Sequence, residues 1–278
     1  MPVTIDEWVV ETSAILRKAG FEGGRMEAQI LAGHAAGQSR SWVLAHGNET
    51  LPSGVEPLLE RRLNHEPLAY ILGFREFYGR DFKVDRSVLV PRHETETVVE
   101  TAMKTCKTFE GPIRVLDIGT GSGCIAVTLA LELENVEITA VDISSDAIAT
   151  AKKNAKTLGA KVKFIESDLF HELPLEEKFD VIVSNPPYIA TTDEIAQEIR
   201  DWEPDPALWG GSDGLQFYHR IAIAAHHYLT PKGRLVFEIG DEMSGAVKWT
   251  CEEEGWVLEE VVDDLNGMPR AAVLKFVG

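Results

Sequence analysis

The sequence predicts an α/β protein in which a doubly wound, mostly parallel sheet follows a small helical domain. From Glu94 onward, helical and strand patterns alternate along the chain. An apolar run at 115–118 leads into three alternate glycines and then into a helical pattern, as expected where a strand turns into a helix. The first 73 residues show helical spacing only. Alternating helices and strands are typical of a sheet covered by helices on both faces.

The N-terminal segment has the spacing of a helix bundle. Further helical stretches follow at 26–36 and 55–63, and we expect Trp42 and Leu44 to fill the bundle core. Residues 1–73 are therefore predicted to form a helical domain. In its first helix, which ends near Ala19-Gly20, the residues expected on one face are Ile5, Trp8, Val9, Thr12, Ile15 and Leu16.

A short hairpin is predicted to link the two domains. Residues 77–84 alternate in the manner of strands on either side of Gly79-Arg80. We assign residues 74–92 to this linker and residues 93–278 to the α/β domain.

Seven strands are expected in the α/β domain, which makes a seven-stranded mixed sheet. The last two flank Asn266-Gly267, a strong hairpin turn, so the final strand should run antiparallel to its neighbour. The expected strands are 113–118, 136–142, 161–166, 179–184, 233–239, 256–262 and 271–277.

Composition narrows the possible partners. The 278-residue chain carries a formal charge of −18, which disfavours a non-specific grip on nucleic acid phosphates. Two of its adjacent basic pairs, Arg61-Arg62 and Lys152-Lys153, are expected on solvated helix faces. We therefore expect no direct nucleic acid partner.

Cysteine usage and hydropathy point to the cytoplasm. The three cysteines are widely spaced with no CxxC motif, so no structural zinc site and no metal are expected. A sparse, odd set of cysteines suits a reducing compartment. With no secretory leader and no 18-residue apolar span in the sequence, we expect a cytoplasmic protein without a membrane partner.

The glycine-rich loop is typical of nucleotide-type ligand binding. Glycine allows tight turning and close ligand approach, and the helix that follows offers unpaired N–H groups. The spacing is GxGxG, whereas the dinucleotide fingerprint is GxGxxG. The candidate cofactor-binding residues of the loop are Gly119, Thr120, Gly121, Ser122 and Gly123.

Acidic residues end the next two expected strands. Asp142 lies about 20 residues beyond the loop, where a ribose-hydroxyl acceptor belongs. Its alternative role is to cap the following helix, but Ser144 or Ser145 can serve as that cap. Asp168 is a candidate acceptor for an adenine amino group, with Leu169 and Phe170 flanking the ring. A solvated loop acid and ordinary core residues are the alternative interpretation for this third strand end.

The segment Asn185-Pro186-Pro187-Tyr188 follows the apolar run 181–183 and narrows the chemistry most. Each proline holds the residue before it in extended geometry and donates no hydrogen bond. The Asn185 side-chain oxygen and the Pro186 carbonyl can then accept both hydrogens of a planar amino group, with Tyr188 stacked on its plane. A stiff turn that ends a buried strand is the alternative interpretation.

Several blocks outside this segment resemble one family. They are 67–73 (PLAYILG), 76–79 (EFYG), 90–92 (VPR), Glu96 before 98–100 (VVE), Glu203-Pro204 with Ala207-Leu208, and 213–215 (DGL). With the glycine loop, the two acidic strand ends and NPPY, they are similar over roughly residues 65–270 to the HemK/PrmC family of release factor glutamine N5-methyltransferases.

The resemblance implies a Rossmann-like class I methyltransferase fold and S-adenosylmethionine as cofactor. It implies methylation of the GGQ glutamine of peptide chain release factors, which the helical domain would grip, and we expect a monomer. Asn185, Pro186 and Tyr188 are then the candidate catalytic residues, Asn185 through Tyr188 the substrate-binding segment, and Asp142, Asp168, Leu169 and Asn185 cofactor-binding residues beside the glycine loop.

Two other functions remain open on the sequence. Adenine N6 presents the same pair of hydrogens as an amide, so NPPY also fits an adenine-N6 DNA or RNA methyltransferase, although no target-recognition segment is evident. A non-catalytic S-adenosylmethionine-binding factor would tolerate loss of NPPY, and the intact segment weighs against it.

Overall fold

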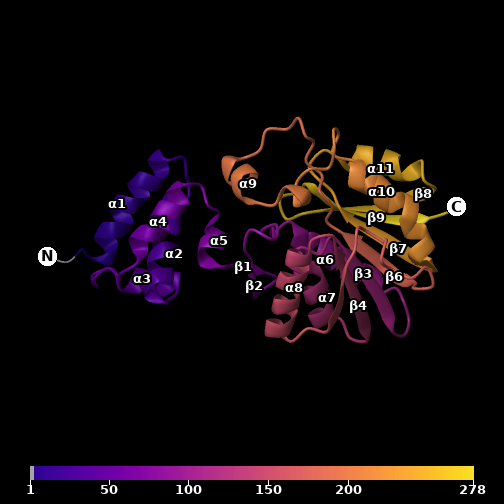
Figure 1. The fold of residues 1–278 in the computed structure, drawn as a ribbon, viewed down its shortest axis with the longest axis horizontal. Coiled ribbons are helices and arrows are strands. Elements are labelled where there is room, and N and C mark those ends of the chain that lie inside the picture. The colour runs from indigo at the N-terminus through magenta and orange to yellow at the C-terminus, as the bar shows by residue number, and fades with distance from the viewer. Residues whose placement is uncertain (1–2) are drawn as a thin grey trace. The chain divides into compact units, whose positions relative to one another are not determined.

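A computed structural model describes residues 3–278, so the first two residues of the expected helical domain lie outside the described residues. The chain divides into two compact units (Figure 1). One unit contains the chain up to Gly73 together with Ala196–Trp202, and the other contains Phe74–Ile195 and Glu203–Gly278. The sequence did not indicate that Ala196–Trp202 would group with the N-terminal segment.

The first unit is helical. Its first helix begins at a capping box, in which the Thr4 hydroxyl accepts from the Glu7 backbone N–H and the Glu7 carboxylate accepts from that of Thr4. Ile5, Trp8 and Leu16 from this helix lie in a common core with residues of the other helices. The helices are α1 (Ile5–Lys18), α2 (Gly24–Ala36), α3 (Arg40–Ala45), α4 (Val55–Leu63), α5 (Leu68–Leu72) and α9 (Gln197–Trp202).

The core position expected for Leu44 was wrong, and Ile15 lies at the exposed margin of its expected helix face. Ile15 is 39% exposed and Leu44 is 58% exposed. Successive residues of a helix point about 100° apart, so a short helix turns only one of three neighbours inward. In α3 that residue is Val43, while Trp42 is half-buried and stacks on the His46 ring at 4.4 Å.

The basic pair Arg61-Arg62 does not form a solvated face. Arg62 is buried, and its guanidinium donates to Glu27 at 2.7 Å and to Glu198 of α9 at 2.6 Å. It also lies 4.0 Å over the ring of Phe21. The carboxylates make burial of this charge tolerable, and they tie α9 to the helices of the first unit. By contrast, both lysines of the pair at 152–153 are exposed, as expected.

The second unit begins with the predicted hairpin, β1 (Phe74–Phe77) and β2 (Arg80–Lys83). Tyr78 and Gly79 both have positive φ, at 51° and 71°, as a two-residue turn of type I′ requires. Phe77 and Phe82 are fully buried and meet edge to face at 5.9 Å.

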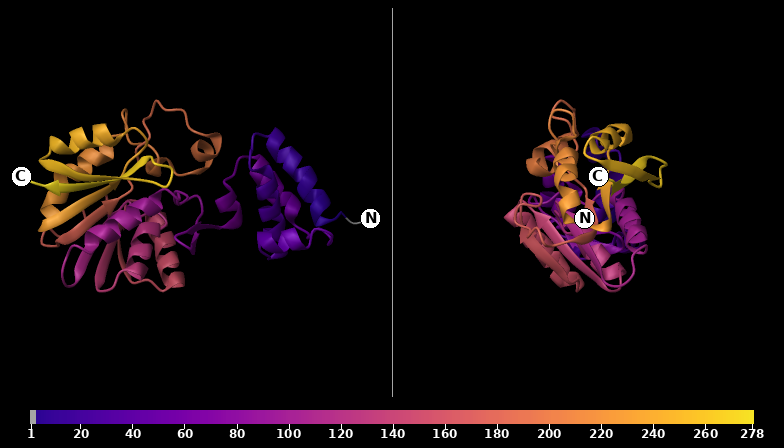
Figure 2. Two further views of the ribbon diagram at one scale, coloured as in Figure 1. Left: turned by 180° about the vertical axis from the view of Figure 1, so that it is seen from behind. Right: turned by 90° about the vertical axis from the view of Figure 1, so that its right-hand side faces the viewer.

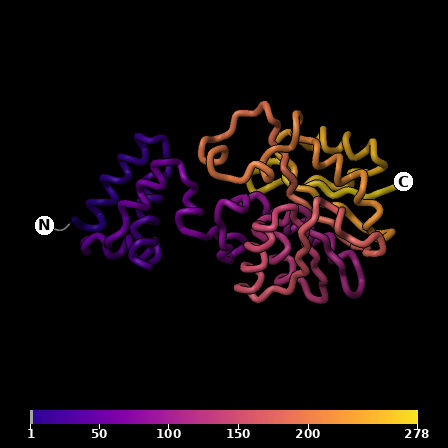
Figure 3. Tube along the Cα trace, viewed as in Figure 1, coloured from indigo at the N-terminus to yellow at the C-terminus, as the bar shows by residue number. Residues whose placement is uncertain are grey.

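The expected seven-stranded mixed sheet is confirmed. The spatial order is β5-β4-β3-β6-β7-β9-β8, and β9 runs antiparallel to both neighbours while the other pairs are parallel. Figure 3 follows the chain through these strands. Their bounds are β3 (Ile113–Ile118), β4 (Val136–Asp142), β5 (Val162–Glu166), β6 (Phe179–Ser184), β7 (Leu229–Glu238), β8 (Trp256–Asp263) and β9 (Pro269–Phe276).

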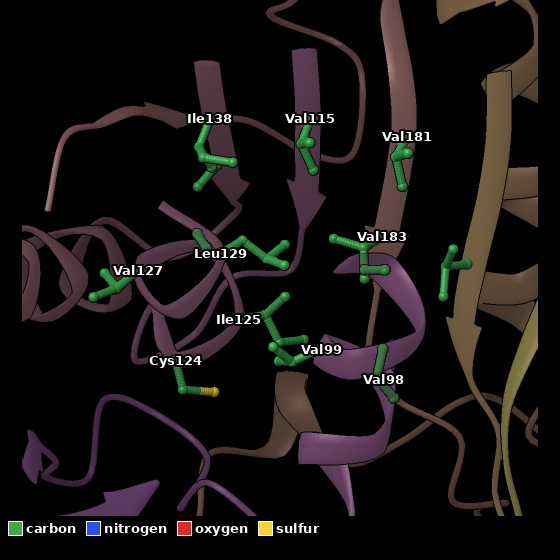
Figure 4. Packing of buried hydrophobic residues seen from close by; sticks show 14 of the residues in the cluster. Val98, Val99, Val115, Cys124, Ile125, Val127, Leu129, Ile138, Val181 and Val183 are labelled. Atoms are coloured by element: carbon green, nitrogen blue, oxygen red, sulfur yellow. The ribbon is translucent and has the colours of Figure 1, made fainter. Parts of the chain in front are cut away.

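Helices cover both faces of the sheet (Figures 1 and 2). On one side α6 (Thr95–Cys106), α7 (Cys124–Glu132) and α8 (Ser145–Leu158) pack on alternate strand residues, as Figure 4 shows for Val115 and Val183 facing Ile125. On the other side α10 (Gln216–Ala225) and α11 (Ser244–Glu252) pack on the residues between them, such as Leu116. The short helices η1 (Asp205–Ala207) and η2 (His226–Tyr228) complete the unit.

All three cysteines are buried and unpaired. Across residues 3–278, every helix is too short or too polar to traverse a lipid bilayer.

Candidate active site

The glycine loop and the NPPY segment leave neighbouring strands at the same edge of the sheet. The glycine loop follows β3 and NPPY follows β6, and the two strands are paired in parallel. The chain order reverses between them, because β4 and β5 lie beyond β3 while β7 lies beyond β6. Ligands of doubly wound sheets bind at such a switch point.

A cavity of about 510 Å³ opens at this edge, within the second unit. It brings together ten of the twelve predicted site residues, and Gly123 and Tyr188 are the two that do not line it. The ten are Gly119, Thr120, Gly121, Ser122, Asp142, Asp168, Leu169, Asn185, Pro186 and Pro187.

The glycine loop has the backbone that its composition predicts. Gly119, Gly121 and Gly123 all have positive φ, between 55° and 82°. Gly123 starts α7 against α8, and a Cβ built on it would lie 3.1 Å from the Cβ of Ala151. The close packing of α7 on α8 therefore explains why position 123 is a glycine.

Asp142 is held by the glycine loop itself. One carboxylate oxygen accepts from the Gly121 N–H at 2.9 Å and the other from the Ser144 N–H at 2.9 Å. Burial raises the pKa of Asp142, and these two hydrogen bonds oppose the rise. Ser144 caps α8, as expected, by accepting from the Ala147 N–H. Each Asp142 oxygen keeps a lone pair for further donors.

The end of β5 differs in part from expectation. Asp168 lines the cavity and pairs with Arg220 of α10 at 2.8 Å. Leu169 also lines it, with an unusual left-handed φ of 51°. Phe170 does not flank the cavity, because it is buried in the core and stacked on Tyr228 at 4.7 Å.

The NPPY segment presents its first three residues to the cavity. Asn185 is half-buried, and its Nδ2 donates to the Thr95 hydroxyl at 3.4 Å. Tyr188 instead packs against Gly240, where an added Cβ would come within 3.1 Å of its ring. Burial raises the pKa of Tyr188 to about 12. The Tyr188 ring therefore belongs to the packing behind the segment rather than to the cavity wall.

Part of the cavity wall was missed by reasoning from the residues alone. Arg92 lines it and donates to Glu203 at 2.6 Å, and the other oxygen of Glu203 accepts from the Val90 N–H. The buried Glu203 thus joins two wall segments that are over a hundred residues apart. In the sequence, Arg92 and Glu203 both lie in blocks that resemble the family, at 90–92 and at Glu203-Pro204. That resemblance was the feature by which they could have been found. Further unassigned wall residues are Pro91, Thr95, Pro204, Pro206, Trp209 and Phe217.

Comparisons with known proteins agree with this architecture. Residues 7–73 match the family model described as PrmC N-terminal domain, and residues 97–201 match the methyltransferase small domain. The chain is 42% identical over 265 residues to the release factor glutamine methyltransferase of Geobacter sulfurreducens, covering 93% of this chain and 92% of that protein. This chain belongs to the release factor glutamine methyltransferase family.

A second family member matches along nearly its whole length, and a solved structure shares the fold. The release factor glutamine methyltransferase of Neisseria gonorrhoeae is 39% identical, with 99% of this chain and 98% of that protein covered. The crystal structure of a Pyrococcus furiosus methyltransferase shares the fold, with a TM-score of 0.53 at 20% identity over 78% of this chain and 98% of that chain. The family resemblance read from the sequence and the methyltransferase fold are both confirmed.

Proposed function

We propose that this family member transfers a methyl group from S-adenosylmethionine to the side-chain amide nitrogen of the GGQ glutamine in peptide chain release factors. The observation that carries the proposal is the cavity at the switch point, where the glycine loop and Asn185 line one space. The relatives named as release factor glutamine methyltransferases supply the substrate class.

The residues present fit the cofactor. A glycine loop before a helix admits a ligand close to the backbone, and Asp142 keeps lone pairs for the two ribose hydroxyls. Leu169 gives an aliphatic wall for the adenine, and Asp168 lies on that side, although Arg220 competes for its carboxylate. S-adenosylmethionine supplies an electrophilic methyl group on a sulfonium sulfur.

Asn185 and Pro186 are the proposed catalytic groups. An amide nitrogen is a poor nucleophile because its lone pair is delocalised into the carbonyl. By accepting both N–H hydrogens, the Asn185 oxygen and the Pro186 carbonyl would stabilise positive charge that develops on nitrogen and orient its lone pair. The N–CH3 bond would form as the S–CH3 bond breaks, the bonding pair would stay on sulfur in the departing thioether, and the nitrogen would release one proton to water or to the same oxygen acceptors. Pro187 stiffens this segment, and Tyr188 supports it from behind.

The wider context is also proposed. The helical unit, with its boundary at residue 73, is the docking domain for the release factor. The net charge of −18 supports a protein partner over a nucleic acid. We place the protein in translation termination, because its proposed substrates are release factors. We place it in the cytoplasm, a reducing compartment that suits its unpaired cysteines. We propose that it acts as a monomer.

The proposal is tested by radiolabelled methyl transfer from S-adenosylmethionine to an unmethylated release factor, with adenine-containing DNA and RNA in parallel. Peptide mapping should place the label on the GGQ glutamine. Label on adenine would favour the nucleic acid enzyme. Absence of label despite tight cofactor binding would leave a non-catalytic binding factor.

Asp142→Ala is expected to weaken S-adenosylmethionine binding about 10- to 100-fold, because hydrogen bonds to a charged acceptor contribute about 1.5–3 kcal/mol. Titration calorimetry measures the dissociation constant. Asp146→Ala is the matched control, since Asp146 is exposed on the first turn of α8 and lies outside the cavity lining. Equal affinity in the two variants would remove Asp142 from the ribose site.

A further inference from the structure

A buried carboxyl group lies behind Asn185. Ser184 of β6 pairs with Phe237 of β7, so the next residues along these parallel strands, Asn185 and Glu238, lie side by side, with Glu238 still paired to Ala271 of β9. Glu238 is 1% exposed and does not line the cavity. Its Oε2 atom has no hydrogen-bond partner among the residues that the structure describes. A buried and partly unpaired carboxylate is costly, so this position calls for an explanation.

Thr95 connects this carboxyl group to Asn185. The Thr95 side chain is buried at the start of α6, and its hydroxyl is the hydrogen-bonding group that lowers the pKa of Glu238 against the effect of burial. The same hydroxyl oxygen accepts from Asn185 Nδ2 at 3.4 Å. A hydroxyl has one proton to donate. When Glu238 is ionised it can only accept, so the Thr95 proton points to Glu238 and the oxygen of Thr95 is left to accept from Asn185.

This direction of hydrogen-bond donation fixes the orientation of the Asn185 side-chain amide. With Nδ2 held by Thr95, the other end of the amide, Oδ1, is the end left for the substrate. The proposed chemistry needs Oδ1 as the acceptor of a substrate hydrogen. Protonation of Glu238 would reverse the order, because a carboxylic acid can donate to Thr95, and Thr95 can then donate to Asn185 Oδ1. The amide would present Nδ2 to the substrate, which is a donor where an acceptor is needed.

We propose that Glu238, acting through Thr95, is a positioning residue that holds Asn185 with its oxygen toward the substrate amide, and that methyl transfer requires Glu238 in its ionised form. This inference rests on the proposed role of Asn185 in methyl transfer.

The charges around Glu238 set the pH range. Burial raises the pKa of Glu238 to about 7, with Glu94 adding to the rise, while the Thr95 hydrogen bond, Arg270 and Arg92 oppose it. Tyr188, Tyr218 and Cys124, whose own pKa values Glu238 raises, face it from other elements and are neutral near pH 7. A carboxyl group is protonated below its pKa, so activity should be full above about pH 7 and fall as the pH drops through that value.

The test is the pH profile of kcat, from pH 5.5 to 8.5 at saturating release factor and S-adenosylmethionine. The wild type should lose about tenfold per pH unit below the pKa. Thr95→Val keeps the shape of the side chain and removes the hydroxyl. We expect its kcat at pH 8 to be about tenfold lower and its affinity for S-adenosylmethionine to be retained. The acid limb, that is, the fall of kcat at low pH caused by protonation of Glu238, should be absent. Glu238→Gln cannot ionise and should likewise lose the limb.

Two further variants separate positioning from packing. Thr95→Ser restores a hydroxyl and should recover most of the kcat and the acid limb. Thr105→Val is the matched control, since Thr105 is a buried threonine of the same helix whose hydroxyl donates only to the Thr101 carbonyl. It should keep the wild-type profile. Circular dichroism establishes that each variant folds.

The outcomes distinguish this inference from the proposed function. If Thr95→Val and Glu238→Gln both keep the wild-type kcat and acid limb while Asn185→Ala is inactive, the positioning role is wrong and the methyl transfer through Asn185 stands. If the wild type fails to methylate release factors, both are wrong.

Discussion

Replacing Asn185 with alanine is expected to lower kcat for release factor methylation about 10²- to 10³-fold, the size of effect seen when one preorganised polar contact to a transition state is removed. Asn185 lines the cavity at the end of β6, and its neighbour Pro186 is fixed by the proline that follows. Alanine keeps the chain path and removes the acceptor. The change should therefore fall on kcat more than on cofactor affinity.

Single-turnover methyl transfer with a saturating release factor measures this effect. The dissociation constant of S-adenosylmethionine, measured by calorimetry on the same preparations, is the internal control and should change by less than about threefold. A variant that turns over at nearly the wild-type rate would show that the Pro186 carbonyl alone suffices, and the role given to Asn185 would be wrong.

Arg62→Ala is expected to destabilise the first unit by about 3 kcal/mol or more, since removing one partner of a buried ion pair leaves uncompensated charge. The side chains of Arg62 and Glu27 are 6% and 13% exposed, so water replaces little of the lost interaction at Glu27. The Glu198 side chain is 35% exposed, so water can solvate its carboxylate and its share of the lost stability should be smaller. The stacking of the guanidinium on Phe21 is lost as well.

Hydrogen exchange of the backbone amides in α2 and α4 reports the stability of this unit separately from the sheet. Arg25→Ala is the matched control, because Arg25 is an exposed arginine of α2 for which the described residues show no ion pair. Its effect should stay below about 1 kcal/mol. Equal protection of α2 and α4 in the two variants would contradict the structural role of Arg62.

The strands and the two motif loops were predictable because each depends on a local property of the chain. Apolar runs of strand length, separated by helical spacing, gave six of the seven strands to within two residues at each end. The exception is β7, which begins at Leu229 and not at residue 233. Its first part contains Pro231, which cannot donate a ladder hydrogen bond, and the pairing with β6 shifts register there. That segment lacks the continuous apolar pattern by which the other strands were found.

The candidate site was predictable only in part. The backbone of the glycine loop follows from residue type. The direction of a side chain at the end of a segment depends on what packs against it, and this is why Tyr188 and Phe170 turned away from the cavity. Thr95 entered its wall because α6 packs beside the strand that carries NPPY, and Arg92 lies there paired with Glu203.

By itself the sequence determined the fold class, the family, the two loops that carry the chemistry and the residue types within them, since these follow from backbone limits and from spacing along the chain. Only the tertiary structure decided which side chains meet. It buried Arg62 between Glu27 and Glu198, and it joined Arg92 to Glu203 across the cavity wall. It also placed Glu238 and Thr95 behind Asn185, because strand register and helix packing bring together residues that are far apart in the chain.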